Sequence, residues 1–164
     1  MQIYLIRHGD AVALGERGIT EDAERPLTEF GQVQIGRLAH AFITKGHRVN
    51  RLLTSPLVRA KETADLLAPV WTLPPEDVIV TEALAPGRSC RRLAKAIRKY
   101  GAETIGLVGH EPDLSEFTAW LIGSKKAKIM LEKGGVARVV VDGDEIEKGC
   151  GVLAWLLSPE WSSM

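Results

Sequence analysis

Short apolar runs alternate along this chain with longer segments in which apolar residues recur at helical spacing. The runs predict β-strands over residues 2–6, 51–54, 78–80, 105–109, 136–141 and 152–157. The periodic segments between them predict amphipathic helices. Because strands and helices alternate, we expect an α/β fold with helices on both faces of a largely parallel sheet.

Several helix limits are marked by residues that favour helix ends. Thr28 is a typical N-cap, and Gly46 follows the last periodic position of that helix. Ser55 and Pro56 predict the N-cap and first residue of the next helix. The buried stripes of the four helices are expected at Ile35, Leu38, Ala39 and Phe42; Leu57, Ala60, Ala64 and Leu67; Leu93, Ala96, Ile97 and Tyr100; and Leu114, Phe117 and Leu121.

The length of 164 residues fits one domain with a substantial core, and no linker or repeat divides the chain. We therefore expect a single three-layer domain over residues 1–164. The net charge of zero gives no general attraction to nucleic acid, and no apolar run is long enough to span a bilayer. Two cysteines, Cys90, expected in a loop near the basic segment, and Cys150, form neither a disulfide framework nor a metal-ligand spacing, which favours a cytoplasmic protein. The four tryptophans are expected to pack in the core: Trp71, Trp120, Trp155 and Trp161.

Basic and imidazole side chains follow three of the predicted strands. Arg7 and His8 end the first strand, Arg59 lies shortly after the second, and His110 ends the fourth. The carboxyl ends of parallel strands meet at one edge of a sheet, where sites form. Taken singly, each residue is more often structural than catalytic, but their coincidence at one edge favours a site.

These residue types suit phosphoryl transfer. A neutral imidazole can attack phosphorus and carry the group as phosphohistidine, and Gly9 lets a backbone carbonyl hold the other ring proton. Guanidinium groups bind phosphoryl oxygens through two parallel donors. The residues therefore predict that His8 is the nucleophile, that Arg7 and Arg59 clamp the phosphoryl group, and that His110 donates to its oxygens. No cluster has the spacing of a metal site, so no metal or other cofactor is expected.

Three motifs carry a resemblance to a known family. Arg7-His8-Gly9, the segment from Thr54 to Ala64 and Val108-Gly109-His110 together resemble the signature of the histidine phosphatase superfamily, whose fold is also called phosphoglycerate mutase-like. The resemblance implies that fold for the whole chain, with the four residues above in the roles already expected. The short length and the segment Arg25-Pro26-Leu27-Thr28 resemble the SixA-type phosphohistidine phosphatases, which implies that Arg25 is a further phosphate ligand.

Two departures argue against a mutase or a sugar-phosphate enzyme. Leu14 stands where mutase-like relatives often carry an asparagine, and the chain has little room for the helical cap of larger relatives. Glu82, after the short third strand, lies where the superfamily uses a carboxylate as general acid or base. It is equally well a solvated loop glutamate. Asp10 and Glu111, which flank the histidines, are weaker candidates.

The predicted function is a metal-independent phosphatase with a covalent phosphohistidine intermediate, acting on phosphohistidine in a signalling protein. One alternative is a phosphatase for small phosphate esters on the same site. Another is a phosphoprotein-binding module without turnover, against which the intact nucleophile argues. The partner is therefore a phosphohistidine-containing protein or a small phosphorylated substrate, not nucleic acid or a membrane. A solvated helix face is the favoured interpretation of the basic segment 88–99, and a docking surface for an acidic phosphoprotein is the alternative.

Overall fold

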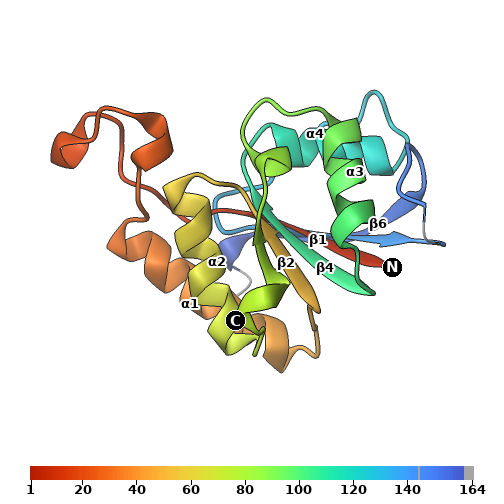
Figure 1. Ribbon diagram of the computed structural model, residues 1–164, viewed down its shortest axis with the longest axis horizontal. Coiled ribbons are helices and arrows are strands. Elements are labelled where there is room, and N and C mark those ends of the chain that lie inside the picture. Colours follow the sequence, from red (N-terminus) through yellow and green to blue (C-terminus); the bar gives the residue numbers. More distant parts are fainter. Residues whose placement is uncertain (144, 161–164) are drawn as a thin grey trace.

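The computed structural model describes residues 1–143 and 145–160 and contains one sheet with helices on both sides (Figure 1). The strands are β1 (Gln2–Arg7), β2 (Arg51–Thr54), β3 (Val78–Val80), β4 (Thr104–Gly109), β5 (Val136–Val141) and β6 (Gly151–Leu157). The α-helices are α1 (Glu29–Thr44), α2 (Val58–Val70), α3 (Cys90–Tyr100) and α4 (Asp113–Leu121). Short 3₁₀ turns are η1 (Glu16–Gly18), η2 (Asp22–Glu24), η3 (Pro75–Asp77) and η4 (Glu82–Leu84).

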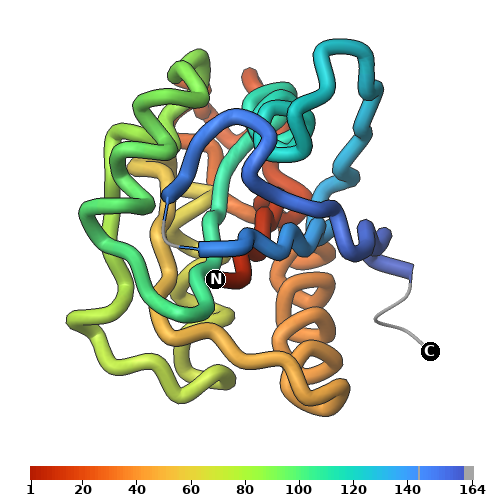
Figure 2. The backbone as a smooth tube through the Cα atoms, turned by 90° about the vertical axis from the view of Figure 1, so that its right-hand side faces the viewer, coloured from red at the N-terminus to blue at the C-terminus, as the bar shows by residue number. Residues whose placement is uncertain are grey.

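The strand order is β3-β2-β4-β1-β5-β6. The first four of these strands are parallel, and β5 and β6 add an antiparallel edge beside β1. Figure 2 shows the N-terminal strand in the middle of the molecule. Within the sheet, Arg7 of β1 lies opposite Gly109 of β4, so the residues that follow these two strands emerge side by side. The predicted α/β fold with a largely parallel sheet is confirmed.

Side chains of the central strand alternate between two hydrophobic clusters. Ile3 and Leu5 pack in the cluster beneath α3 and α4, whereas Tyr4 and Ile6 pack with α1 and α2 on the other face. This alternation follows from the two-residue period of a strand. Because β1 is buried on both faces, its C-terminal end is held rigidly, and the site is built there.

Most of the predicted helix limits hold. The Thr28 hydroxyl accepts a hydrogen bond from the Gly31 amide at 2.9 Å, as an N-cap does. Gly46 adopts φ = 80° just after α1, a conformation that glycine takes without strain. The basic side chains of segment 88–99 are all exposed, which fits a solvated helix face and a docking surface equally well.

Two local predictions are wrong. Ser55 is not the N-cap of α2, because that helix begins at Val58 with Leu57 as its cap residue. Ser55 is fully buried, and its hydroxyl is bonded to His110 instead. Cys90, expected in a loop, is the first residue of α3, which is capped by the Ser89 hydroxyl.

The segment 11–27 is an exposed arm between β1 and α1, visible in red at the upper left of Figure 1. It carries η1 and η2, and nearly all residues from 13 to 24 are exposed. A single β-bridge between Ala11 and Leu27 closes its base. Figure 1 shows that the arm projects from the body of the molecule on the side of α1 and α2. Among the described residues, no helix is long and apolar enough to cross a membrane.

Candidate active site

The two predicted site histidines lie together beyond the ends of β1 and β4. The ring centroids of His8 and His110 are 5.1 Å apart, and both side chains are buried, with exposed fractions of 6% and 3%. The parallel pairing of β1 with β4 places them there. This convergence was expected from the strand pattern alone.

His8 is held in one tautomer by the backbone that follows it. Its Nδ1 lies 2.7 Å from the Gly9 carbonyl oxygen, which accepts the ring proton. Nε2 is therefore the nitrogen with the free lone pair, and it accepts a hydrogen bond from Arg59 Nε at 3.2 Å. Glycine is required at position 9, because a Cβ there would lie 2.9 Å from the Gly31 carbonyl oxygen and 2.8 Å from Ile35.

The surroundings keep both imidazoles neutral. The pKa of His8 is lowered to about 4, mainly by burial and also by the charges of Arg59, Arg7 and Lys133, against the Gly9 hydrogen bond that raises it. The pKa of His110 is lowered to about 3, again mainly by burial and also by His8 and the same two arginines, against the charge of Asp22 that raises it. At neutral pH the His8 imidazole is therefore unprotonated, as a histidine nucleophile has to be.

His110 is oriented by a buried serine. Its Nε2 lies 2.7 Å from the Ser55 hydroxyl, and its Nδ1 is buried without a hydrogen-bond partner among the described residues. Ser55 directly follows β2 and has no exposed surface. The end of β2 therefore supports the end of β4, and one ring nitrogen of His110 is left without a partner.

Arg59 lies beside His8 on the first turn of α2. Its side chain is buried, and its guanidinium group donates to His8, to the Asp22 carbonyl oxygen at 2.6 Å and to Asp22 Oδ2 at 3.0 Å. Arg25 reaches the same carboxylate, with Nη1 2.8 Å from Asp22 Oδ1. Two of the predicted phosphate ligands are thus held together by one aspartate of the arm.

Arg7 approaches the site from β1. Its Nη1 donates to the Leu131 carbonyl oxygen at 2.9 Å, and its Nε is buried without a described partner. The positive charge of Arg7 is close enough to lower the pKa of both His8 and His110. Arg7 therefore retains unused donors beside the two imidazoles.

The acidic candidates near the histidines differ in their surroundings. Glu82, in η4, has a side chain that is 61% exposed and lies 3.7 Å from Arg88. Glu111 has one carboxylate oxygen buried without a partner, and burial raises the pKa of its carboxyl, against contacts with Ser115 and the charge of Arg7 that lower it. Asp10 is bonded to Lys133 and Thr28. No described contact joins any of these three carboxylates to His8.

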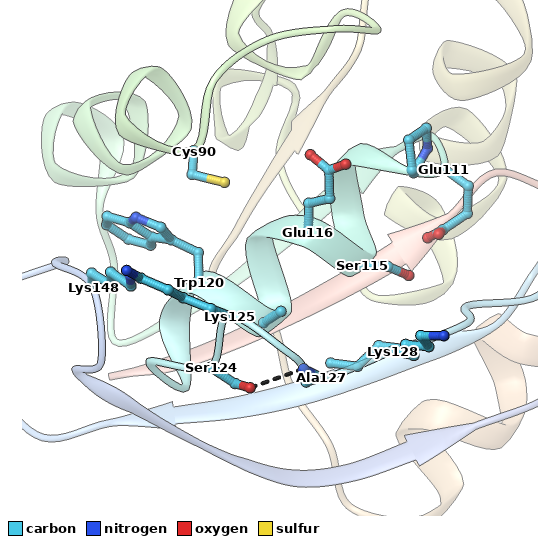
Figure 3. Close-up of a pocket in the computed structure, with 13 residues that line it drawn as sticks. Cys90, Glu111, Ser115, Glu116, Trp120, Ser124, Lys125, Ala127, Lys128 and Lys148 are labelled. Carbon is cyan, nitrogen blue, oxygen red and sulfur yellow. Dashed lines mark hydrogen bonds between the residues drawn. The ribbon is translucent and has the colours of Figure 1, made fainter.

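A pocket of about 530 Å³ lies beside the site, over α4 and the loop after it. Figure 3 shows Glu111 and Ser115 at one end of this pocket, and Trp120 with Lys125 and Lys148 at the other. Its lining includes neither of the two site histidines. Glu111, which follows His110 in the chain, is part of the lining, but none of the predicted phosphate ligands is.

Comparison with known proteins agrees with this geometry. The family model of the histidine phosphatase superfamily (branch 1) matches residues 3–85, which is half of the chain and includes Arg7, His8, Arg25, Arg59 and Glu82. The chain belongs to the histidine phosphatase superfamily. An uncharacterized protein of Picosynechococcus sp. is 32% identical to this phosphatase over 98% of both chains.

Two of the named relatives that match over nearly the whole chain are of the SixA type. The phosphohistidine phosphatase SixA of Escherichia coli (strain K12) is 26% identical, over 97% of this histidine phosphatase and 94% of the relative. A structure of the protein histidine phosphatase SixA complexed with tungstate superposes with a TM-score of 0.83 at 25% identity, covering 97% of each chain. The expected resemblance is therefore confirmed over nearly the whole length.

Sequence reasoning missed three residues of this histidine phosphatase site. Ser55 was expected to cap a helix, Asp22 is one of several acidic residues in the arm, and Lys133 lies far from the motifs in sequence. Ser55 lies within the motif from Thr54 to Ala64, but nothing in the sequence distinguishes Asp22 or Lys133 from charged residues that face water. Among the described residues, no group of three or more His, Cys, Asp or Glu side chains could hold a metal ion.

Proposed function

We propose that this phosphatase removes phosphoryl groups from phosphohistidine in a signalling protein, through a covalent intermediate on His8. The observation that carries the proposal is the fixed tautomer of His8, whose Nε2 is unprotonated and lies 3.2 Å from Arg59 Nε. Binding alone would not need a nucleophile prepared in this way. The full-length similarity to SixA-type relatives supports the choice of substrate.

The reaction takes place in two displacements at phosphorus. The lone pair of His8 Nε2 forms a bond to phosphorus as the bond to the substrate nitrogen breaks, and the leaving imidazole takes up a proton from solvent. Water then attacks the phosphoryl group on His8, which breaks the bond to Nε2, releases inorganic phosphate and one proton to solvent, and restores the neutral imidazole. Arg7, Arg25 and Arg59 bind the phosphoryl oxygens, and the ring of His110 donates to one of them.

The leaving group explains why phosphohistidine is favoured over esters. An ester leaves as an alkoxide and needs a proton in the transition state, whereas a protonated imidazole is a far better leaving group. Glu82, the candidate general acid, is exposed and faces Arg88. A site with a weak proton donor suits phosphohistidine, and hydrolysis of small phosphate esters is the second candidate activity.

Turnover by the purified protein decides between these activities. We expect a phosphohistidine protein to be dephosphorylated with a higher kcat/KM than any member of a panel of phosphate esters. Quenched enzyme should carry an acid-labile, base-stable phosphoryl group that mass spectrometry places on His8. A phosphoryl group on Ser55 or Ser89, or preferred turnover of an ester, would contradict the proposal.

The proposed mechanism needs no metal, because arginine and histidine side chains supply the charge around phosphorus. We expect turnover to be unchanged in EDTA and to be inhibited by vanadate. Activity that is lost in EDTA and returns with Mg²⁺ or Zn²⁺ would show that the mechanism is wrong.

A further inference from the structure

The carboxylate of Asp22 binds two arginines through separate oxygens. Oδ1 accepts from Arg25 Nη1 at 2.8 Å, and Oδ2 accepts from Arg59 Nη2 at 3.0 Å. These two bonds lower the pKa of Asp22, so it is ionised at neutral pH. The carbonyl oxygen of the same residue accepts from Arg59 Nη1 at 2.6 Å.

These contacts determine which edge of the Arg59 guanidinium faces the nucleophile. The Nη1–Nη2 edge is occupied by Asp22, while Nε, on the adjacent Nε–Nη2 edge, donates to His8 Nε2. A guanidinium group has five N–H donors, so one Nη2 donor remains on the same edge as Nε. The Nε–Nη2 edge of Arg59 therefore faces His8 Nε2, the nitrogen that would receive the phosphoryl group.

We propose that Asp22 is a positioning residue for phosphoryl binding, which holds the Nε–Nη2 edge of Arg59 toward His8 and fixes Arg25 beside it. The inference rests on the proposed function, since it assumes that Arg59 and Arg25 bind the phosphoryl group. An arginine side chain has many rotamers, and a carboxylate that holds its far end removes that entropy before substrate binds. Asp22 acts through the arginines and need not touch the substrate.

A competing interpretation predicts the opposite sign. If the Asp22 carboxylate instead bound the guanidinium donors that the phosphoryl oxygens use, an incoming oxyanion would have to displace it. Removing the carboxylate would then tighten oxyanion binding. The contacts favour positioning, because Asp22 accepts from the Nη1–Nη2 edge of Arg59 and not from the adjacent Nε–Nη2 edge, which faces His8.

The test compares Asp22→Asn with Glu21→Gln and Glu24→Gln, two neutralised carboxylates of the same arm that form no described ion pair. Tungstate serves as the probe, and its binding to the full chain is measured by calorimetry without turnover. Loss of charge-assisted hydrogen bonds predicts that Asp22→Asn raises the Kd of tungstate roughly tenfold to a hundredfold. The control variants should bind as the native protein does, and thermal unfolding should show that all variants fold.

A second measurement separates positioning from a general effect on the arm. In an Arg59→Ala, Arg25→Ala background, Asp22→Asn should change the Kd of tungstate less than about twofold, because the groups it positions are gone. An equal loss in both backgrounds, unchanged or tighter binding by Asp22→Asn, or no tungstate binding by the native protein would overturn the inference. Failure of phosphohistidine turnover with a normal tungstate result would contradict only the proposed substrate.

Discussion

The candidate site joins two regions that are held in place in different ways. His8 and His110 follow strands buried on both faces, and a backbone carbonyl and a buried serine orient their rings. Asp22 and Arg25 lie on the arm, and the Asp22 side chain is 53% exposed. The proposed nucleophile is thus fixed by the hydrophobic core, whereas the geometry of the proposed arginine clamp depends on a few charged contacts at the surface.

The strand-end region should give the largest effect. His8→Ala removes the nucleophile, and we expect kcat to fall on the order of ten-thousandfold or more, as for other covalent catalysts that lose this group. Single-turnover assays with a phosphohistidine protein measure this loss. His40→Ala is a control on the exposed face of α1 and should retain full activity. Turnover that continues in His8→Ala would exclude the covalent mechanism.

Arg59 connects the two regions and should come next. Arg59→Ala removes a positioned donor pair, which is expected to cost roughly a hundredfold or more in kcat. Arg59→Lys should restore little, because an ammonium group lacks the planar fork that contacts both His8 and Asp22. The measurement is kcat/KM of both variants relative to the native protein. Near-native activity of Arg59→Lys would show that bidentate binding is not needed.

The same contrast explains what the sequence could predict. Periodicity predicts the strands, and the ends of parallel strands predict where His8, His110 and Arg7 lie, because both depend on the core. Ser55 was misinterpreted because Ser-Pro before a helix also matches an N-cap, and only the tertiary contact with His110 shows otherwise. Asp22 was missed because a loop acid that binds arginines is identical in sequence to one exposed to water. Trp161, expected in the core, lies outside the described residues.

Acidification affects the two regions in different pH ranges. Because burial lowers the pKa of His8 from 6.5 to about 4, kcat/KM should fall tenfold per pH unit only below about pH 4. The unfolded chain protonates His8 and His110 at higher pH than the folded chain does. The free energy of unfolding should therefore be greatest above about pH 6.5. Below that pH it should fall by roughly 1.4 kcal/mol per pH unit for each histidine.

Chemical denaturation between about pH 7.5 and pH 4.5 measures this slope. In His8→Ala the slope should be smaller by the contribution of one histidine. In the arm, the lowered pKa of Asp22 keeps its carboxylate ionised, so its bonds to Arg25 and Arg59 persist through the same range and weaken only under more acidic conditions. A stability that does not change between these pH values would mean that the histidines are not held neutral in the folded chain.

Arg25 tests how much the arm contributes by itself. Its Nε donates to the Val12 carbonyl oxygen at 2.6 Å and its Nη1 to Asp22, and it is only partly buried. Since exposed charge is screened by water, we expect Arg25→Ala to lower kcat/KM by about tenfold, less than Arg59→Ala does. Arg17→Ala, on the same arm, is the matched control. A loss equal to that of Arg59→Ala would mean that the arm is as essential as the strand ends.

The smallest effects on phosphohistidine turnover should come from the two glutamates near the site. Glu82→Gln and Glu111→Gln should each change it by less than about threefold, because the leaving imidazole needs little help from a carboxylic acid. Ester hydrolysis distinguishes them: if Glu82 is the general acid, Glu82→Gln slows it roughly a hundredfold or more while Glu111→Gln does not. A large loss in Glu111→Gln alone would assign the proton donor to the carboxyl whose pKa burial raises. Equal, small losses on both substrates would make Glu82 a solvated partner of Arg88, and proton delivery would then depend on neither glutamate.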